Sequence, residues 1–113
     1  MRNKFEKLVA KALPADYRYE AARLTYQIPA STYTPDWISP DGRTIIESKG
    51  RFSEEDRRKM RLIRQQFPHL RIIMIFQNPR TRISKRSKTT YEEYARKIGI
   101  EVMTLGEVAI LLG

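Results

Sequence analysis

The sequence predicts an α/β fold, a mixed central sheet flanked by helices, from two observations. The first is the order of its elements: helix, strand, β-hairpin, helix, strand, helix, strand, helix. The second is a continuous apolar run over 72–76, which is typical of a strand buried on both faces. At 113 residues the chain is long enough for one hydrophobic core, so we expect a single domain over 1–113.

The first elements are a helix and a length of extended chain. Apolar residues recur at helical spacing ahead of Pro14, which cannot continue a helix, and this predicts a helix over 2–13. Apolar and polar residues then alternate over 17–28, the period of a strand. We expect that strand in one piece or in two pieces interrupted by Ala21-Ala22.

The clearest local signal is the β-hairpin. Segments 33–38 and 43–49 are rich in β-branched and aromatic residues, and Asp41-Gly42 between them is a pair favoured in two-residue hairpin turns. A two-residue turn at that place pairs Pro40 with Arg43. This pairing sets the register of the whole hairpin.

The second half of the chain alternates helices and strands. Ser53 is followed by three acidic residues, which is typical of an N-cap and a first helical turn. Segment 77–88 carries five basic residues and no acid, so we expect an exposed basic loop. The other predicted elements are a helix over 54–66, a strand over 72–76, a helix from Thr90 to Gly99, a strand over 100–103 and a helix over 105–112.

Composition limits the chemistry and the partners. There is no Cys and only one histidine, His69, so any metal must be held by carboxylates. The 22 Lys and Arg against 13 Asp and Glu give a net charge of +9, which attracts a polyanion. Nucleic acid is the expected partner, although a structural binder or a generally basic surface protein fits the charge equally. No apolar run could span a membrane and no signal-peptide core is present, so we expect an intracellular protein.

Three hairpin residues converge in the predicted register. Asp36 lies opposite Glu47, and Lys49 projects to the same face as Glu47 because side chains alternate along a strand. Opposed carboxylates repel each other unless a cation lies between them, and Mg²⁺ prefers oxygen ligands together with waters and phosphate. The predicted reaction is metal-assisted phosphodiester hydrolysis, in which Lys49 orients the attacking water or stabilises the developing charge.

The plainer alternative is a solvated strand face with Lys49 as an ordinary ion-pair partner. Against it, Pro35-Asp36 followed by Glu47-Ser48-Lys49 matches the PD-(D/E)xK nuclease pattern, in a hairpin that a helix follows. Together with the basic charge, the pattern favours an endonuclease with a restriction-endonuclease-like core. The core says little about which DNA is cut, so a sequence-specific or nicking enzyme is one alternative and a non-catalytic basic DNA-binding module is another.

The sequence also resembles the endonuclease I junction resolvases of the T-odd phages over nearly its full length. The resemblance implies a homodimer that resolves four-way (Holliday) junctions during DNA recombination. It also implies two Mg²⁺ ions per site, for which Mn²⁺ would substitute, and the cytoplasm of a bacterial host. The segments that carry it are Ile28-Pro29-Ala30-Ser31, Tyr33-Thr34-Pro35-Asp36, Glu47-Ser48-Lys49-Gly50, Asp56-Arg57-Arg58-Lys59, Leu62-Ile63-Arg64, Ser87 to Tyr91 and Gly99-Ile100.

The resemblance further implies a catalytic, metal-binding glutamate on the first helix, and Glu6 is the residue that matches it. In the implied domain-swapped homodimer, segment 1–28 is exchanged between subunits. Glu6 of one chain then joins the hairpin residues of the other chain. The plainer alternative is a solvent-facing acid beside Lys4 and Lys7.

The sequence differs from the family in lacking most of a basic N-terminal arm and a basic C-terminal tail. The link at 29–32 is shorter, and Ser48 replaces the usual threonine. Basic side chains near the hairpin and in the basic loop would supply phosphate contacts instead, although such charge runs are as often only solvated. The residues predicted to contact DNA are Arg51, Arg57, Arg58, Lys59, Arg80, Arg82, Lys85, Arg86 and Lys88.

Overall fold

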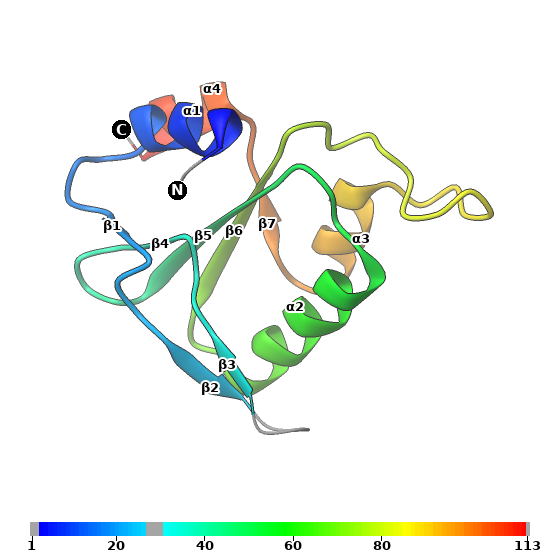
Figure 1. Cartoon of the computed structure of the whole chain (residues 1–113), viewed down its shortest axis with the longest axis horizontal. Coiled ribbons are helices and arrows are strands. Elements are labelled where there is room, and N and C mark those ends of the chain that lie inside the picture. The colour runs from blue at the N-terminus through cyan, green and yellow to red at the C-terminus, as the bar shows by residue number, and fades with distance from the viewer. Residues whose placement is uncertain (1–2, 27–30, 113) are drawn as a thin grey trace.

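The computed structural model describes residues 3–26 and 31–112 and confirms an α/β fold with a mixed sheet (Figure 1). Its sheet has the strand order β1-β4-β5-β6-β7, in which β5–β6 and β6–β7 are parallel and the other pairs are antiparallel. A second ladder, β2–β3, lies outside that sheet. The strands are β1 (Arg18–Tyr19), β2 (Leu24–Tyr26), β3 (Ser31–Tyr33), β4 (Trp37–Ile38), β5 (Thr44–Lys49), β6 (Arg71–Phe76) and β7 (Glu101–Val102).

The described residues contain four helices, and each begins with a capping box. In each box the cap side chain accepts the N–H of the third helical residue, whose acidic side chain accepts the N–H of the cap. The predicted 54–66 helix has the bounds that its pattern indicated. The helices are α1 (Lys4–Ala12), α2 (Glu54–Gln66), α3 (Tyr91–Lys97) and α4 (Leu105–Leu111).

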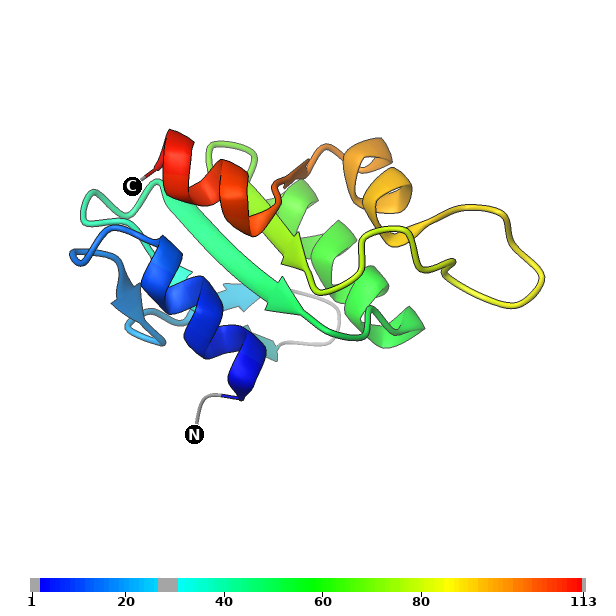
Figure 2. The ribbon, with the colours of Figure 1, turned by 90° about the horizontal axis from the view of Figure 1, so that it is seen from above.

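The helices cover both faces of the sheet (Figures 1 and 2). Helices α1 and α4 lie side by side on one face, and α2 and α3 cover the other. The interior strand β6 serves both layers, since Ile73 joins the core with Val9 of α1 while Met74 joins the core with Met60 of α2. All four side chains are at most 1% exposed. Burial on both faces is why this strand appears in the sequence as an unbroken apolar run.

Segment 33–38 forms two strands in place of the single predicted strand. Tyr33 ends β3 in the small ladder, and Trp37 begins β4 in the main sheet. Between them lies the buried Pro35, which has no N–H to donate to a ladder. The break places Asp36 just outside the main ladder.

The predicted two-residue hairpin turn is also wrong, although its register holds. Pro40 and Arg43 do not pair; the Ser39 N–H donates to the Thr44 carbonyl at 2.9 Å and the Gly42 N–H returns to the Ser39 carbonyl at 3.0 Å. The turn therefore spans 40–43. Gly42 adopts φ 73°, a left-handed conformation that glycine accepts without strain.

The extended chain after α1 forms two strands, β1 and β2, so the predicted alternative of two interrupted pieces is confirmed. It breaks at Glu20, whose φ of 47° ends β1 and turns the chain toward β2. Residues 27–28 of the predicted strand, residue 2 of the predicted helix and residues 29–30 of the 29–32 link lie outside the described residues. Within the described residues, no helix combines the length and apolarity that a membrane crossing requires.

Candidate active site

The hairpin register places Asp36 next to Glu47. Trp37 pairs with Ile46 and Ile38 with Ile45, so the predicted register is confirmed for both pairs of the ladder. Asp36 is the next residue beyond it, and its N–H donates to Oε2 of Glu47 at 3.2 Å. The main chain of Asp36 thus contacts the carboxylate that the sequence predicted as its neighbour.

The carboxylate of Asp36 turns toward Ser48, which lies near the C-terminal end of β5. Its Oδ2 accepts the Ser48 N–H at 2.9 Å and the Ser48 hydroxyl at 3.0 Å. Burial raises the pKa of Asp36, the two Ser48 hydrogen bonds oppose that effect, and the charge of Glu6 adds to it. Asp36 is therefore held by its neighbour on β5 while it lies close enough to Glu6 for their charges to interact.

Glu47 is a buried acid, with 5% of its surface exposed. Its Oε2 accepts a 2.6 Å hydrogen bond from the Tyr33 hydroxyl as well as the Asp36 N–H. Burial, followed by the charge of Asp36, raises the pKa of Glu47 to about 7. A carboxyl with such a pKa lacks sufficient compensating positive charge, which a bound cation would supply.

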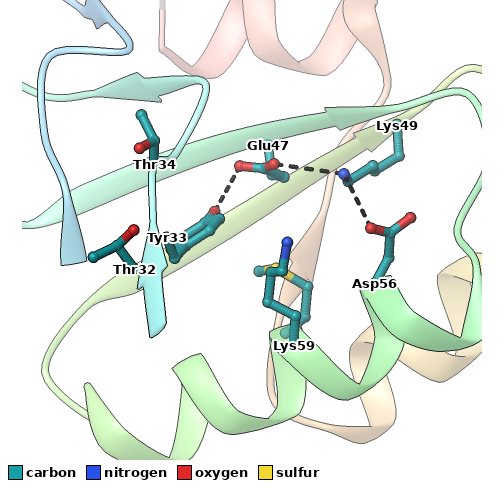
Figure 3. Close-up of a pocket in the computed structure, with 8 residues that line it drawn as sticks. Thr32, Tyr33, Thr34, Glu47, Lys49, Asp56 and Lys59 are labelled. Carbon is teal, nitrogen blue, oxygen red and sulfur yellow. Dashed lines mark hydrogen bonds and ion pairs between the residues drawn. The ribbon is translucent and has the colours of Figure 1, made fainter. Parts of the chain in front are cut away.

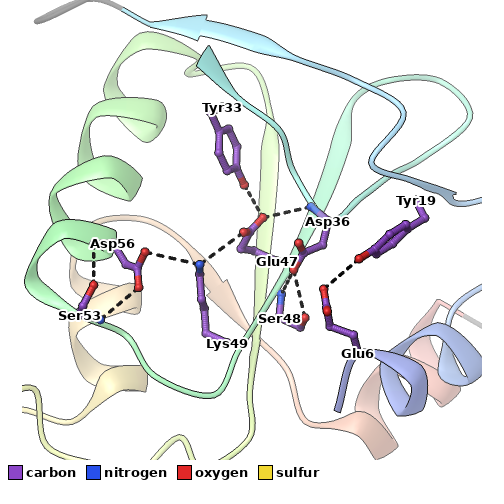
Figure 4. A network of polar contacts seen from close by, with 9 residues as sticks. All are labelled: Glu6, Tyr19, Tyr33, Asp36, Glu47, Ser48, Lys49, Ser53 and Asp56. Atoms are coloured by element: carbon purple, nitrogen blue, oxygen red, sulfur yellow. Dashed lines mark hydrogen bonds and ion pairs between the residues drawn. The ribbon is translucent and has the colours of Figure 1, made fainter. Parts of the chain in front are cut away.

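Lys49 lies between two acids (Figures 3 and 4). Its Nζ is 3.8 Å from Oε1 of Glu47 and 3.5 Å from Oδ1 of Asp56. Asp56 is the acidic member of the α2 capping box and accepts the Ser53 N–H at 3.2 Å. The sequence analysis placed this acid in the first turn of a helix and in a segment shared with the family, but it assigned Asp56 no role in the site, because nothing in the local pattern shows that α2 begins beside β5.

A cavity of about 200 Å³ opens between β3, β5 and α2 at these residues (Figure 3). Glu47, Lys49 and Asp56 form one side of it. Lys59 extends from α2 toward β5 and forms no ion pair with any described residue. The other lining residues are Thr32, Tyr33, Thr34 and Met60.

Glu6 belongs to α1, which covers the face of the sheet opposite to the cavity, and it lies near Asp36 within the same chain (Figure 4). It belongs to the α1 capping box with Asn3, and Oε2 accepts a 3.3 Å hydrogen bond from the Tyr19 hydroxyl. Its charge contributes to the raised pKa of Asp36. Glu6 is half-buried, whereas its neighbours Lys4 and Lys7 are exposed, so it is not simply a solvent-facing acid.

The oxygen atoms of Asp36 and Glu47 suit a hard divalent cation. Each carboxylate has one oxygen that accepts two hydrogen bonds and one oxygen, Oδ1 of Asp36 and Oε1 of Glu47, that accepts none from the described residues. Those residues contain no cluster of three acidic or histidine side chains close enough to chelate an ion. Mg²⁺ nevertheless commonly binds to one or two protein carboxylates, with water and phosphate oxygens as its remaining ligands.

The predicted DNA contacts divide into three groups. Arg57 is engaged within the fold: it donates to the carbonyls of Phe52 at 2.7 Å and Ile83 at 3.3 Å and stacks 5.8 Å from the Tyr94 ring centre. Lys59 lines the cavity. The exposed group comprises Arg51, Arg58, Arg80, Arg82, Lys85, Arg86 and Lys88, of which the last five lie on the basic loop that projects from the molecule (Figure 2).

The fold and site together define an α/β protein with a buried carboxylate and a lysine at the end of the central strand of its sheet. The chain belongs to the phage endonuclease I family, whose model matches residues 1–104. It is 41% identical over 105 residues to Endonuclease I of Escherichia phage T7, a match that covers 88% of this chain and 70% of that protein. It is also 40% identical over 104 residues to Endodeoxyribonuclease 1 of Enterobacteria phage T3, which covers 88% of this chain and 68% of that protein.

Proposed function

We propose that this protein is a Mg²⁺-dependent endodeoxyribonuclease that hydrolyses phosphodiester bonds in branched DNA and resolves four-way junctions. The observation that carries the proposal is the buried Glu47, whose Oε1 faces Lys49 at the mouth of a cavity. The names of the two phage relatives and the net charge of +9 support DNA as the substrate.

Asp36 and Glu47 are the residues that would hold the metal, and Glu6, whose charge acts on Asp36, is the third acid that we propose for the set. A bound Mg²⁺ lowers the pKa of a coordinated water and stabilises negative charge on a phosphate. Mn²⁺, which has similar ligand preferences, is expected to substitute, and we propose two ions per site.

Lys49 would act on the reacting phosphate directly. Its ammonium carries three donors, and the ion pairs with Glu47 and Asp56 limit where it can point. From the cavity edge it can donate to the attacking water or to a phosphate oxygen as charge develops. Lys59 and the basic loop would contact neighbouring phosphates and orient the strand.

The active form in this proposal is a homodimer with a restriction-endonuclease-like core. Segment 1–28 would be exchanged between subunits, so that each active site combines Glu6 of one chain with the hairpin of the other. In the single chain Glu6 already lies beside Asp36, which means that an exchange of equivalent segments would rebuild the same set of side chains.

Cleavage of a four-way junction is to be compared with cleavage of a linear duplex of the same sequence, each with Mg²⁺ and with a chelator. We expect metal-dependent cutting of the junction that Asp36→Asn and Lys49→Ala abolish while junction binding is largely kept. Absence of metal-dependent cutting of either DNA would overturn the enzyme proposal. Equal cutting of both would leave an endonuclease but remove the preference for junctions.

The shared site has its own experiment, in which Glu6→Gln chains are mixed with Asp36→Asn chains. In an exchanged dimer one of the two sites then contains neither substitution, so activity returns after subunit exchange. Each variant alone should stay inactive. Mixed dimers that form but show no recovery would count against the exchange.

A further inference from the structure

The two carboxylates of the site share a pattern of hydrogen bonds (Figure 4). In each, one oxygen accepts two donors and the other accepts none from the described residues. One donor of each pair is a main-chain N–H, which the fold supplies regardless of the side chains. The second is a hydroxyl, from Tyr33 for Glu47 and from Ser48 for Asp36.

Tyr33 lies in the core with 4% of its surface exposed, so its ring has little freedom to move. Its hydroxyl lies 2.6 Å from Oε2 of Glu47, a short distance typical of a hydrogen bond to a charged acceptor. The ring comes from β3, outside the main sheet, and so links the small ladder to β5. It fixes which oxygen of Glu47 turns toward Lys49 and the cavity.

Ser48 performs the same task on Asp36. Its N–H and hydroxyl both donate to Oδ2, at 2.9 and 3.0 Å, which fixes the plane of the carboxylate. Asp36 lies outside the β4 ladder, so main-chain pairing with β5 does not hold it in place. The Ser48 contacts therefore substitute for the missing strand pairing.

We propose that Tyr33 and Ser48 are positioning residues for the metal ligands, with hydroxyls that keep Oε1 of Glu47 and Oδ1 of Asp36 available to a divalent cation. This proposal rests on the proposed function and names the residues that orient its metal site. Neither hydroxyl contacts the metal or the DNA. Partners of this kind affect metal affinity because a ligand free to rotate must be ordered again each time an ion binds.

The test measures Mn²⁺ binding to the whole protein without DNA, by isothermal titration calorimetry, for wild type, Tyr33→Phe and Ser48→Ala. Loss of such a partner typically weakens metal affinity by about 10- to 100-fold. We expect that range for each variant. Ser48→Thr keeps the hydroxyl and should bind Mn²⁺ as the wild type does.

A second readout is the Mn²⁺ concentration that gives half-maximal cleavage of a four-way junction. It should rise by the same factor in Tyr33→Phe and Ser48→Ala, and saturating Mn²⁺ should restore most of the rate. Tyr91→Phe is the matched control, because Tyr91 is a buried tyrosine of the same core that contacts aromatic rings and forms no hydrogen bond with a carboxylate of the described residues. Far-ultraviolet circular dichroism confirms that each variant is folded.

The outcomes separate the two proposals. If the wild type binds Mn²⁺ while folded Tyr33→Phe and Ser48→Ala bind it equally well, the positioning role is wrong and the endonuclease proposal stands. If Tyr91→Phe loses as much affinity as Tyr33→Phe, the effect is one of core packing and the positioning role is again wrong. A wild type that neither binds Mn²⁺ nor cuts DNA would overturn both.

Discussion

Replacing Glu47 by glutamine should stabilise the metal-free protein in a pH-dependent way. Burial and the charge of Asp36 raise the pKa of Glu47 from 4.5 to about 7. Between those values the folded state holds a proton that the unfolded state has lost, so the stability of the wild type falls as pH rises through this window. Glutamine resembles the neutral acid in shape and does not titrate, so the variant escapes that loss.

The size of the effect follows from the two pKa values. At about 1.36 kcal/mol for each pH unit, the full shift corresponds to roughly 3 kcal/mol. Between about pH 5 and about pH 8.5 the free energy of unfolding of the wild type should fall by roughly 2 to 3 kcal/mol relative to that of Glu47→Gln, because part of the loss has already occurred by pH 5. Titration of groups that do not interact with Glu47 cancels in this comparison.

The assay is urea unfolding of both proteins at the two pH values in the presence of a chelator. Glu101→Gln is the control of opposite sign: a hydrogen bond from Arg71 lowers the pKa of Glu101, which is 47% exposed, so this substitution should cost at most about 1 kcal/mol. If the difference in free energy of unfolding between Glu47→Gln and the wild type does not change with pH, the pKa of Glu47 is not raised in the folded state. A variant less stable than wild type at the higher pH would refute the reasoning equally.

Three further predictions concern the core, the cavity and the loop. Phe52→Ala should cost about 3–5 kcal/mol in urea unfolding, since this ring is fully buried among aromatic neighbours; a loss below about 1 kcal/mol would contradict this packing. Lys59→Ala should lower the slope of log junction affinity against log salt by about 1, because one phosphate contact is lost. Lys97 is exposed on α3, and Lys97→Ala should leave the slope unchanged. If the two variants have equal slopes, Lys59 does not contact a phosphate. Arg57→Ala should speed proteolysis within 77–88, because its guanidinium joins α2 to that loop; unchanged cleavage would argue against this role.

Local chemistry accounts for the elements that were predicted correctly. The start of α2 follows from the Ser53 cap, and the burial of β6 follows from its apolar run, because both signals depend on neighbours in the chain. The hairpin register was also predictable, since turn and strand residues lie within a short segment. The turn itself was not, because Ser39 and Thr44 close a longer loop through hydrogen bonds that no dipeptide preference indicates.

Motif spacing and hairpin register are properties of contiguous chain, so the amino-acid pattern was sufficient to predict an α/β protein with Asp36, Glu47 and Lys49 as candidate catalytic residues. The surroundings of these three residues could be learned from the folded chain alone. Tyr33 reaches Glu47 because a proline-containing break sends β3 out of the main sheet, and Asp56 reaches Lys49 because α2 begins beside β5. These contacts depend on how separate elements pack, and packing places side chains together that no local pattern relates.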